Sequence, residues 1–200
     1  MVRNPEAHRK TPPWHIEADV DQLLNYTQPI VFQGEDQVPT FEAIDRKKYD
    51  TAFVIGRWQP PHRGHMRLIE EAARQADRVI IGIGSANVSD SDNPFSVDKR
   101  RRILELAIEE NVLLKGKIEL IVPINDYDND EFWYREVMRK TYGGIDVVLG
   151  RNEWVNGIFR EKNIPVIEPK LFHREVYEGT KIRDELRRDQ ELKLLSRTIH

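Results

Sequence analysis

Short apolar runs recur at regular intervals through the last three quarters of the chain. They are rich in valine and isoleucine and mostly do not alternate with polar residues, which is typical of strands buried on both faces of a parallel sheet. The predicted strands cover residues 52–55, 79–83, 118–122, 147–149 and 166–167.

Amphipathic helical patterns separate these runs. In the first of them, Leu68, Ile69, Ala72 and Ala73 lie on one side of a helix. The predicted helices cover residues 64–76, 97–111, 130–141, 153–162 and 184–189. Alternation of strand and helix predicts an α/β fold with a doubly wound, parallel, five-stranded sheet. Ligands of such sheets bind beyond the carboxyl ends of the strands.

The first 49 residues follow a different pattern, with several prolines and scattered apolar residues. We interpret residues 1–49 as an N-terminal extension and residues 50–200 as the main domain. A short helix is expected at 19–25 and a short strand at 29–33. The extension contains several aromatic residues, so we expect it to pack along the main domain or against a neighbouring subunit.

Composition narrows the class of protein. The 200 residues are 39% hydrophobic and 32% charged, with a net charge of −3 and no cysteine. The lack of a basic excess argues against a nucleic-acid binder, and the lack of cysteine excludes disulfides and thiolate metal sites. The first eight residues lack the apolar core of a signal peptide, and no apolar run reaches membrane-spanning length. We therefore expect a cytoplasmic protein with no membrane partner.

Candidate chemistry concentrates in residues 53–65, where a strand ends in a short turn and a helix begins. Gly56 and Gly64 allow a ligand to approach the backbone closely. The free N–H groups and dipole of a helix N-terminus attract anions, and His62 and His65 add side-chain donors there. The turn is predicted to bind phosphate; two surface histidines on an ordinary βα turn are the alternative.

A second helix start, at residues 179–183, has similar chemistry. Gly179 and Thr180 indicate a helix beginning, with Thr180 as the expected N-cap. Lys181 and Arg183 then lie in the first turn, where the helix dipole disfavours cations. An anion bound there would explain them, although a solvated helix start is an equal alternative.

Together these two helix starts resemble the nucleotidyltransferase superfamily that carries an H-x-G-H motif. His62, Arg63, Gly64 and His65 match that motif, and residues 179–183 resemble its C-terminal partner. Further short matches at 83–86, 93–96, Trp133 and 171–175 make the chain most similar to archaeal-type nicotinamide mononucleotide adenylyltransferases. The resemblance implies a nucleotidyltransferase domain over residues 50–200 that moves AMP from ATP to nicotinamide mononucleotide, giving NAD and pyrophosphate.

The resemblance also implies roles for individual residues. The implied catalytic residues are His65, His62 and Arg183. The residues implied to bind ATP and its phosphates are Gly56, Arg57, Gln59, Gly64, Thr180, Arg100 and Asn152. Those implied for the mononucleotide are Gly84, Ser85 and Trp133. Trp133 would stack on the cationic nicotinamide ring, and a core tryptophan is the alternative.

The resemblance implies Mg²⁺ delivered with ATP, no metal site of the protein's own, and a homo-oligomer. The chain departs from the family pattern at Trp58, Pro61 and Glu178, and Glu178 adds negative charge beside the second helix start. Three alternatives remain open. The acceptor could be pantetheine phosphate, a flavin precursor or a cytidylyl acceptor; the protein could sense nucleotides without turnover; or His62 and His65 could bind a metal, although no third ligand is identifiable.

Overall fold

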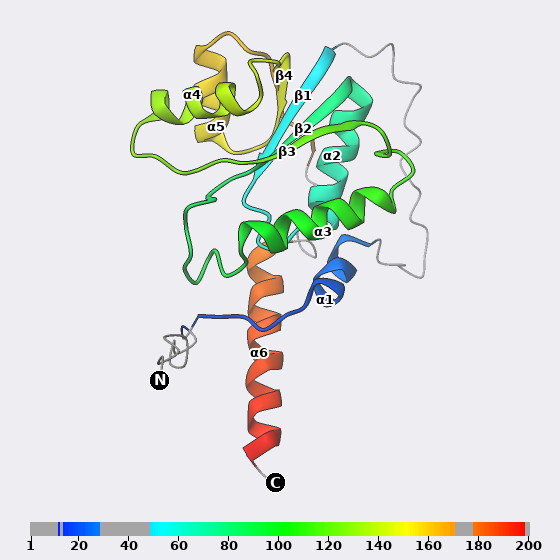
Figure 1. Ribbon diagram of the computed structural model, residues 1–200, viewed down its shortest axis with the longest axis vertical. Coiled ribbons are helices and arrows are strands. Elements are labelled where there is room, and N and C mark those ends of the chain that lie inside the picture. The colour runs from blue at the N-terminus through cyan, green and yellow to red at the C-terminus, as the bar shows by residue number, and fades with distance from the viewer. Residues whose placement is uncertain (1–11, 13, 29–48, 171–177, 199–200) are drawn as a thin grey trace, which may run out of the picture.

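A parallel five-stranded sheet forms the centre of the protein. The computed structural model describes residues 12, 14–28, 49–170 and 178–198 (Figure 1). The strands pair in parallel in the order β3-β2-β1-β4-β5. Their bounds are β1 Tyr49–Gly56, β2 Ala76–Ile83, β3 Ile118–Pro123, β4 Val147–Leu149 and β5 Val166–Ile167. The doubly wound α/β sheet and its five strands are therefore confirmed, whereas the strand expected at 29–33 and the match at 171–175 lie outside the described residues.

Helices cover both faces of the sheet, as the alternating pattern predicts (Figure 1). On one face, α2 and α3 pack against β1, β2 and β4. On the other face, α4 and α5 pack against the same strands. The bounds are α2 Arg63–Gln75, α3 Val97–Glu109, α4 Asp130–Lys140 and α5 Glu153–Glu161. A last helix, α6 (Gly179–Thr198), extends away from the sheet (Figure 1).

Side chains alternate between two apolar layers along the central strands. On β1, Ala52 and Val54 face α2 and α3, whereas Phe53 faces α4 and α5. All three are fully buried, which is why the strand reads as a continuous apolar run rather than an alternating one. The pattern predicted this layering but missed Glu70, a carboxylate buried on α2.

The strand order changes direction at β1, because β2 and β3 lie on one side of it and β4 and β5 on the other. A crevice for ligands is expected at the carboxyl ends of strands beside such a switch. The carboxyl ends of β1 and β2 are Gly56 and Ile83, and these two residues are paired in register. α2, α4 and α5 begin at this same edge of the sheet.

Part of the N-terminal extension packs on the main domain, as expected. It forms α1 (Val20–Leu24), capped by the carboxylate of Asp19, and a 3-10 turn, η1 (Asn25–Thr27). Its apolar side chains are buried together with residues of α3 and α6. No helix among the described residues is both long and apolar enough to cross a membrane.

Two glycine substitutions test this packing. A Cβ on Gly82, in the centre of the sheet, would lie 2.9 Å from Cζ of Phe53 and 3.0 Å from Cγ1 of Ile55. Gly82→Ala should therefore lower the free energy of unfolding by about 1–3 kcal/mol. A Cβ on Gly157, inside α5, meets nothing within 4 Å, so Gly157→Ala should raise stability by up to ~1 kcal/mol through helix propensity. Urea unfolding measures both, and equal effects would contradict the packing.

Candidate active site

Two histidines meet at the start of α2. The His62 and His65 rings are stacked, with centroids 3.6 Å apart and planes inclined by 22°. His62 is the N-cap residue, and its carbonyl accepts hydrogen bonds from the His65 and Met66 N–H groups. The Nδ1 atoms of both rings are buried without a partner in the protein. Unsatisfied polar atoms of this kind are typical of a functional site rather than of a core.

Both histidines are neutral near pH 7. Burial lowers the pKa of His62 to about 4. Burial and the neighbouring His62 hold the pKa of His65 well below its ordinary value. A neutral imidazole still donates one hydrogen bond, so the two rings can serve as donors to an anion without repelling each other.

Trp58 supports His65 from the side of the sheet. The indole is buried and meets the His65 ring edge-on, with centroids 4.7 Å apart. Its Nε1 donates to the carbonyl oxygen of Gly82 at 2.7 Å. Gly56 lies directly above the indole, because a Cβ there would come within 3.3 Å of it. The departure from the family pattern at position 58 thus forms part of the floor of the site.

The start of α6 docks on the turn that follows β1. Arg183 Nη1 donates to the carbonyl oxygen of Gln59 at 2.8 Å, and its Nη2 lies 3.3 Å from Oγ1 of Thr180. A Cβ on Gly179 would lie 3.1 Å from the same Gln59 oxygen, so this close approach favours glycine. The two helix starts singled out in the sequence are therefore neighbours. α6 begins at Gly179, and the carbonyl of Glu178 accepts from the Ile182 N–H at 3.1 Å, so Glu178 occupies the N-cap position. Thr180 lies in the first turn, and its expected N-cap position is wrong by two residues.

Charged side chains gather around this junction. Arg183 is buried, and burial lowers its pKa, while the carboxylate of Asp92 acts in the opposite direction. Asp92 accepts from Arg183 Nη2 at 3.2 Å and is itself largely exposed. Arg57 is exposed and close enough to lower the pKa values of both Arg183 and Asp90, although for Asp90 the Asn93 hydrogen bond is the larger cause. Asp92 is a site residue that the sequence did not reveal.

Gln59 and Arg100 use their side chains to hold backbone. The Gln59 amide donates to the carbonyl of Phe95 at 3.1 Å and accepts from its N–H at 3.0 Å. Arg100 is buried, and its Nη1 donates to the carbonyls of Arg57 and Gly84 at 2.7 and 2.8 Å. A weaker bond reaches the carbonyl of Ser85 at 3.4 Å. Burial lowers the Arg100 pKa to about 10, so it stays charged; contact of these two residues with a nucleotide stays a prediction.

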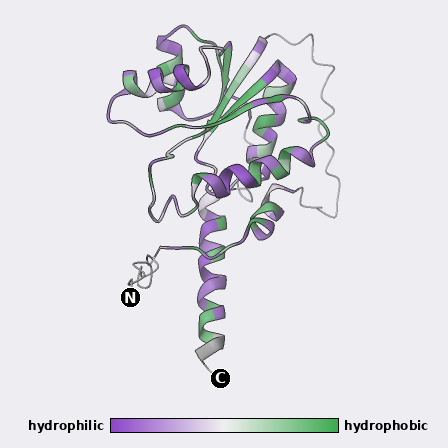
Figure 2. Ribbon diagram, in the orientation of Figure 1, coloured by the Kyte–Doolittle hydropathy of each residue, from purple (hydrophilic) through white to green (hydrophobic). Residues whose placement is uncertain are grey.

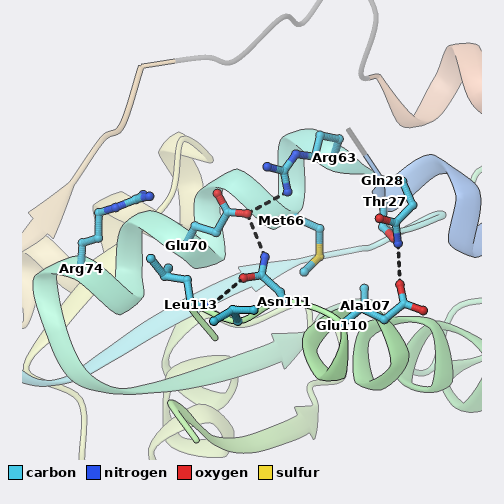
Figure 3. Close-up of a pocket in the computed structure, with 11 residues that line it drawn as sticks. Thr27, Gln28, Arg63, Met66, Glu70, Arg74, Ala107, Glu110, Asn111 and Leu113 are labelled. Carbon is cyan, nitrogen blue, oxygen red and sulfur yellow. Dashed lines mark hydrogen bonds and ion pairs between the residues drawn. The ribbon is translucent and has the colours of Figure 1, made fainter. Parts of the chain in front are cut away.

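Arg63, the variable residue of the H-x-G-H motif, points away from the histidines. Its Nη1 donates to the buried carboxylate of Glu70 at 2.7 Å, and Asn111 donates to the same oxygen (Figure 3). These residues line a hollow of about 380 Å³ behind α2, which also includes Gln28 and Leu113. The hollow lies between α2 and the C-terminal end of α3, and the Arg63–Glu70 ion pair links two turns of α2 beside it.

The implied mononucleotide residues, Gly84, Ser85 and Trp133, lie at the same edge of the sheet and are all buried. Ser85 is buried and has a positive φ of 48°, two residues after the end of β2. Trp133 is only 1% exposed and packs edge-on against Trp154 and Phe159, with centroids 4.9 and 6.1 Å away. Its stacking on a ligand stays a prediction. Trp154, in the first turn of α5, is 42% exposed, and the apolar periodicity of its helix does not distinguish it as a site residue.

Asn152 caps α5, because its side chain accepts from the Val155 N–H at 3.3 Å. Glu178 lies just before α6, and its carboxylate is 3.9 Å from Nζ of Lys181. The structure thus brings together His62, His65, Arg57, Thr180 and Arg183. It assigns Gln59, Arg100 and Asn152 hydrogen bonds within the protein.

Comparison with known proteins gives consistent results. The sequence profile of the cytidylyltransferase-like family matches residues 53–185. The nicotinamide-nucleotide adenylyltransferase of Methanolobus tindarius is 37% identical over 145 residues, which cover 72% of this chain and 81% of that protein. The same enzyme of Methanococcus aeolicus is 36% identical over the same coverage.

Among solved structures, a bifunctional NMN adenylyltransferase/ADP ribose pyrophosphatase from Francisella tularensis, complexed with AMP and a manganese ion, matches with a TM-score of 0.58 and 25% identity. The match covers 68% of this chain but only 41% of that longer one. A second structure of the same bifunctional protein matches with a TM-score of 0.58 and 27% identity, covering 68% of this chain and 42% of that one.

The buried histidines predict that acid weakens the fold. Because the folded pKa of His62 is about 4 and the ordinary value is 6.5, the unfolded chain takes up a proton in this window that the folded chain does not. Stability is then lost as the pH falls below the ordinary value, by up to ~1.4 kcal/mol per pH unit for each such histidine. Urea unfolding near pH 7 and near pH 5 should show a smaller loss for His62→Asn than for the wild type. Equal losses of unfolding free energy in the variant and the wild type would contradict a lowered pKa of His62 in the folded protein.

Proposed function

Because the chain belongs to the cytidylyltransferase-like family, and the matched region includes the starts of both α2 and α6, we propose that it is a nicotinamide-nucleotide adenylyltransferase. It transfers AMP from ATP to nicotinamide mononucleotide and so makes NAD and pyrophosphate. The names of relatives at 36% and 37% identity support the substrate pair.

One observation carries the proposal: the N-termini of α2 and α6 meet at the turn after β1. The contact is the Gln59 carbonyl, which accepts from Arg183 and lies against Gly179. Each helix N-terminus supplies free N–H groups and partial positive charge. Two such ends, one with His62 and His65 and one with Thr180 and Arg183, suit a ligand with several phosphates in a row.

The chemistry requires positioning and charge stabilisation. A 5′-phosphate oxygen of the mononucleotide attacks the α-phosphorus of ATP in line, and the bond from that phosphorus to the bridging oxygen breaks. Pyrophosphate leaves with the bonding electron pair. The attacking oxygen is already ionised at neutral pH, so no general base is needed, and neutral histidines suffice as hydrogen-bond donors. We assign His65 and His62 to contacts with the ATP phosphates at the start of helix α2. We assign Arg183, Thr180 and Arg57 to the β- and γ-phosphates.

The base of the mononucleotide would bind near the first turns of α4 and α5, above the ends of β1 and β2. Trp133 is the residue assigned to the nicotinamide by resemblance, and Trp154 covers it. We therefore propose that the two indoles act together and that Trp154 presents the accessible aromatic face. Gly84 and Ser85 would line the ribose phosphate, and Asn152 the adenosine.

Magnesium is proposed to arrive with ATP. Within the described residues, no group of three or more histidine, aspartate or glutamate side chains is arranged to hold a metal ion. The phosphates of the nucleotide would supply oxygen ligands of the kind that magnesium prefers. A homo-oligomer, a cytoplasmic location and a domain boundary near residue 50 remain predictions.

Incubation of the protein with ATP, Mg²⁺ and nicotinamide mononucleotide should produce NAD. His65→Asn, which removes the imidazole beside Trp58, should lower kcat by about 100-fold or more, as expected for loss of a preorganised transition-state donor. Chromatographic detection of NAD measures both. Turnover of pantetheine phosphate or a flavin precursor instead would contradict the acceptor, and full activity of His65→Asn would contradict its role.

Trp154→Ala should raise KM for the mononucleotide by about tenfold, since an aromatic face over a cationic ring contributes roughly 1–2 kcal/mol. KM for ATP should change little. Tyr142→Ala is the matched control, because Tyr142 is 86% exposed and follows the far end of α4. Steady-state kinetics with each substrate varied in turn would contradict the proposal if both variants behaved alike.

A further inference from the structure

The helix α6 carries half of the proposed phosphate site but has few apolar contacts of its own. Figure 2 shows that it is largely hydrophilic along its length. Its buried apolar side chains are Ile182 and Leu186, on either side of the buried Arg183 and within two turns of the helix start. Farther along, Leu192, Leu194 and Leu195 are exposed. The position of Thr180 and Arg183 therefore depends on what covers Ile182 and Leu186.

The N-terminal segment covers them. Ile182 and Leu186 belong to a buried apolar cluster in which the segment supplies Ile16, Ala18 and Leu23. The remaining buried members are Phe95, whose backbone Gln59 holds, and Ile103 of α3. The segment thus fills the angle between α3 and α6, and in Figure 1 it crosses α6 below its first turns.

Polar contacts fix the same segment along α6. The Gln190 side chain accepts from the Glu17 N–H at 2.9 Å and donates to the carbonyl of His15 at 3.3 Å, so one amide satisfies the backbone on both sides of Ile16. Tyr26 hydrogen-bonds Glu185. Burial is the main cause of the raised pKa of Tyr26, and the neighbouring Glu185 carboxylate adds to it. On the α3 side, Lys99 Nζ donates to the carbonyl of Ala18 at 2.8 Å.

Residues 14–28 lie outside the region that the family profile matches, which begins at residue 53. We propose that this segment is a positioning element of the ATP site: it holds α6 against α3 so that Thr180 and Arg183 face the turn after β1. Its side chains do not touch the reacting atoms and act only through α6. The inference rests on the proposed function for its kinetic readout, although ATP binding tests it directly.

Gln190→Ala removes both hydrogen bonds to the segment without opening the apolar cluster. KM and Kd for ATP should rise about threefold to tenfold, the change expected when a hydrogen bond that holds the site in place is lost. KM for the mononucleotide should change less than twofold. The matched control is Gln28→Ala, since Gln28 belongs to the same part of the chain but its side chain donates at 2.6 Å to Glu110, the C-cap residue of α3, instead of to α6.

Ile16→Ala tests the apolar contact. It should weaken ATP binding at least as much as Gln190→Ala does. Ile145→Ala controls for general loss of stability, because Ile145 is also buried, 7% exposed against 1% for Ile16, but belongs to another cluster just before β4. If Ile145→Ala lowers stability without changing the Kd for ATP, the effect of Ile16→Ala is local.

Calorimetric titration with ATP and thermal unfolding of each variant complete the test. Unchanged Kd and KM for ATP in both folded variants would overturn the proposal, as would equal effects on both substrates. Failure of the proposed function would give a different result, because the wild type would then make no NAD. The ATP titrations would still show whether each variant binds ATP more weakly than the wild type.

Discussion

The site depends on one constraint: the buried turn between β1 and α2 must have its backbone carbonyls satisfied. Among the described residues, no backbone N–H donates to the carbonyls of Arg57 and Gln59, and side chains from two helices donate to them instead. Arg100 of α3 binds the carbonyl of Arg57, and Arg183 of α6 binds that of Gln59. Leaving such groups unpaired would cost roughly 1–3 kcal/mol each. The same bonds therefore stabilise the turn and bring three helices to the ends of the strands.

This arrangement separates two tasks. Residues whose side chains hydrogen-bond the backbone, such as Arg100 and Gln59, fix the shape of the turn after β1. Residues that still have unsatisfied or exposed polar groups, such as His65 and Arg57, can respond to a ligand. The floor beneath them is rigid because Trp58 is tied to β2 and packed against His65. A preorganised site of this kind needs little reorganisation when charge shifts during a reaction.

Local pattern predicted the strands, the helices that cover them and the two helix starts at His62–His65 and Gly179–Arg183, because each depends on neighbours in the sequence. The hydrogen-bond partners and burial of individual side chains depend on tertiary contacts and could not be predicted in the same way. Arg100 and Gln59 have the polarity of nucleotide contacts, yet their bonds go to carbonyls and an N–H far away in the chain. Likewise, Glu70 is buried on α2 only because Arg63, Arg67 and Asn111 converge on it.

Arg100 has a further consequence, which concerns ionic strength. Its guanidinium is buried behind the ends of β1 and β2 and has no carboxylate hydrogen bonded to it in the described structure. Mobile counterions screen an exposed charge such as Arg57 within about 10 Å at 0.1 M salt, but they cannot surround a charge inside the protein. The proposed attraction of this edge for a polyanion would therefore have a part that salt weakens and a part that persists in concentrated electrolyte.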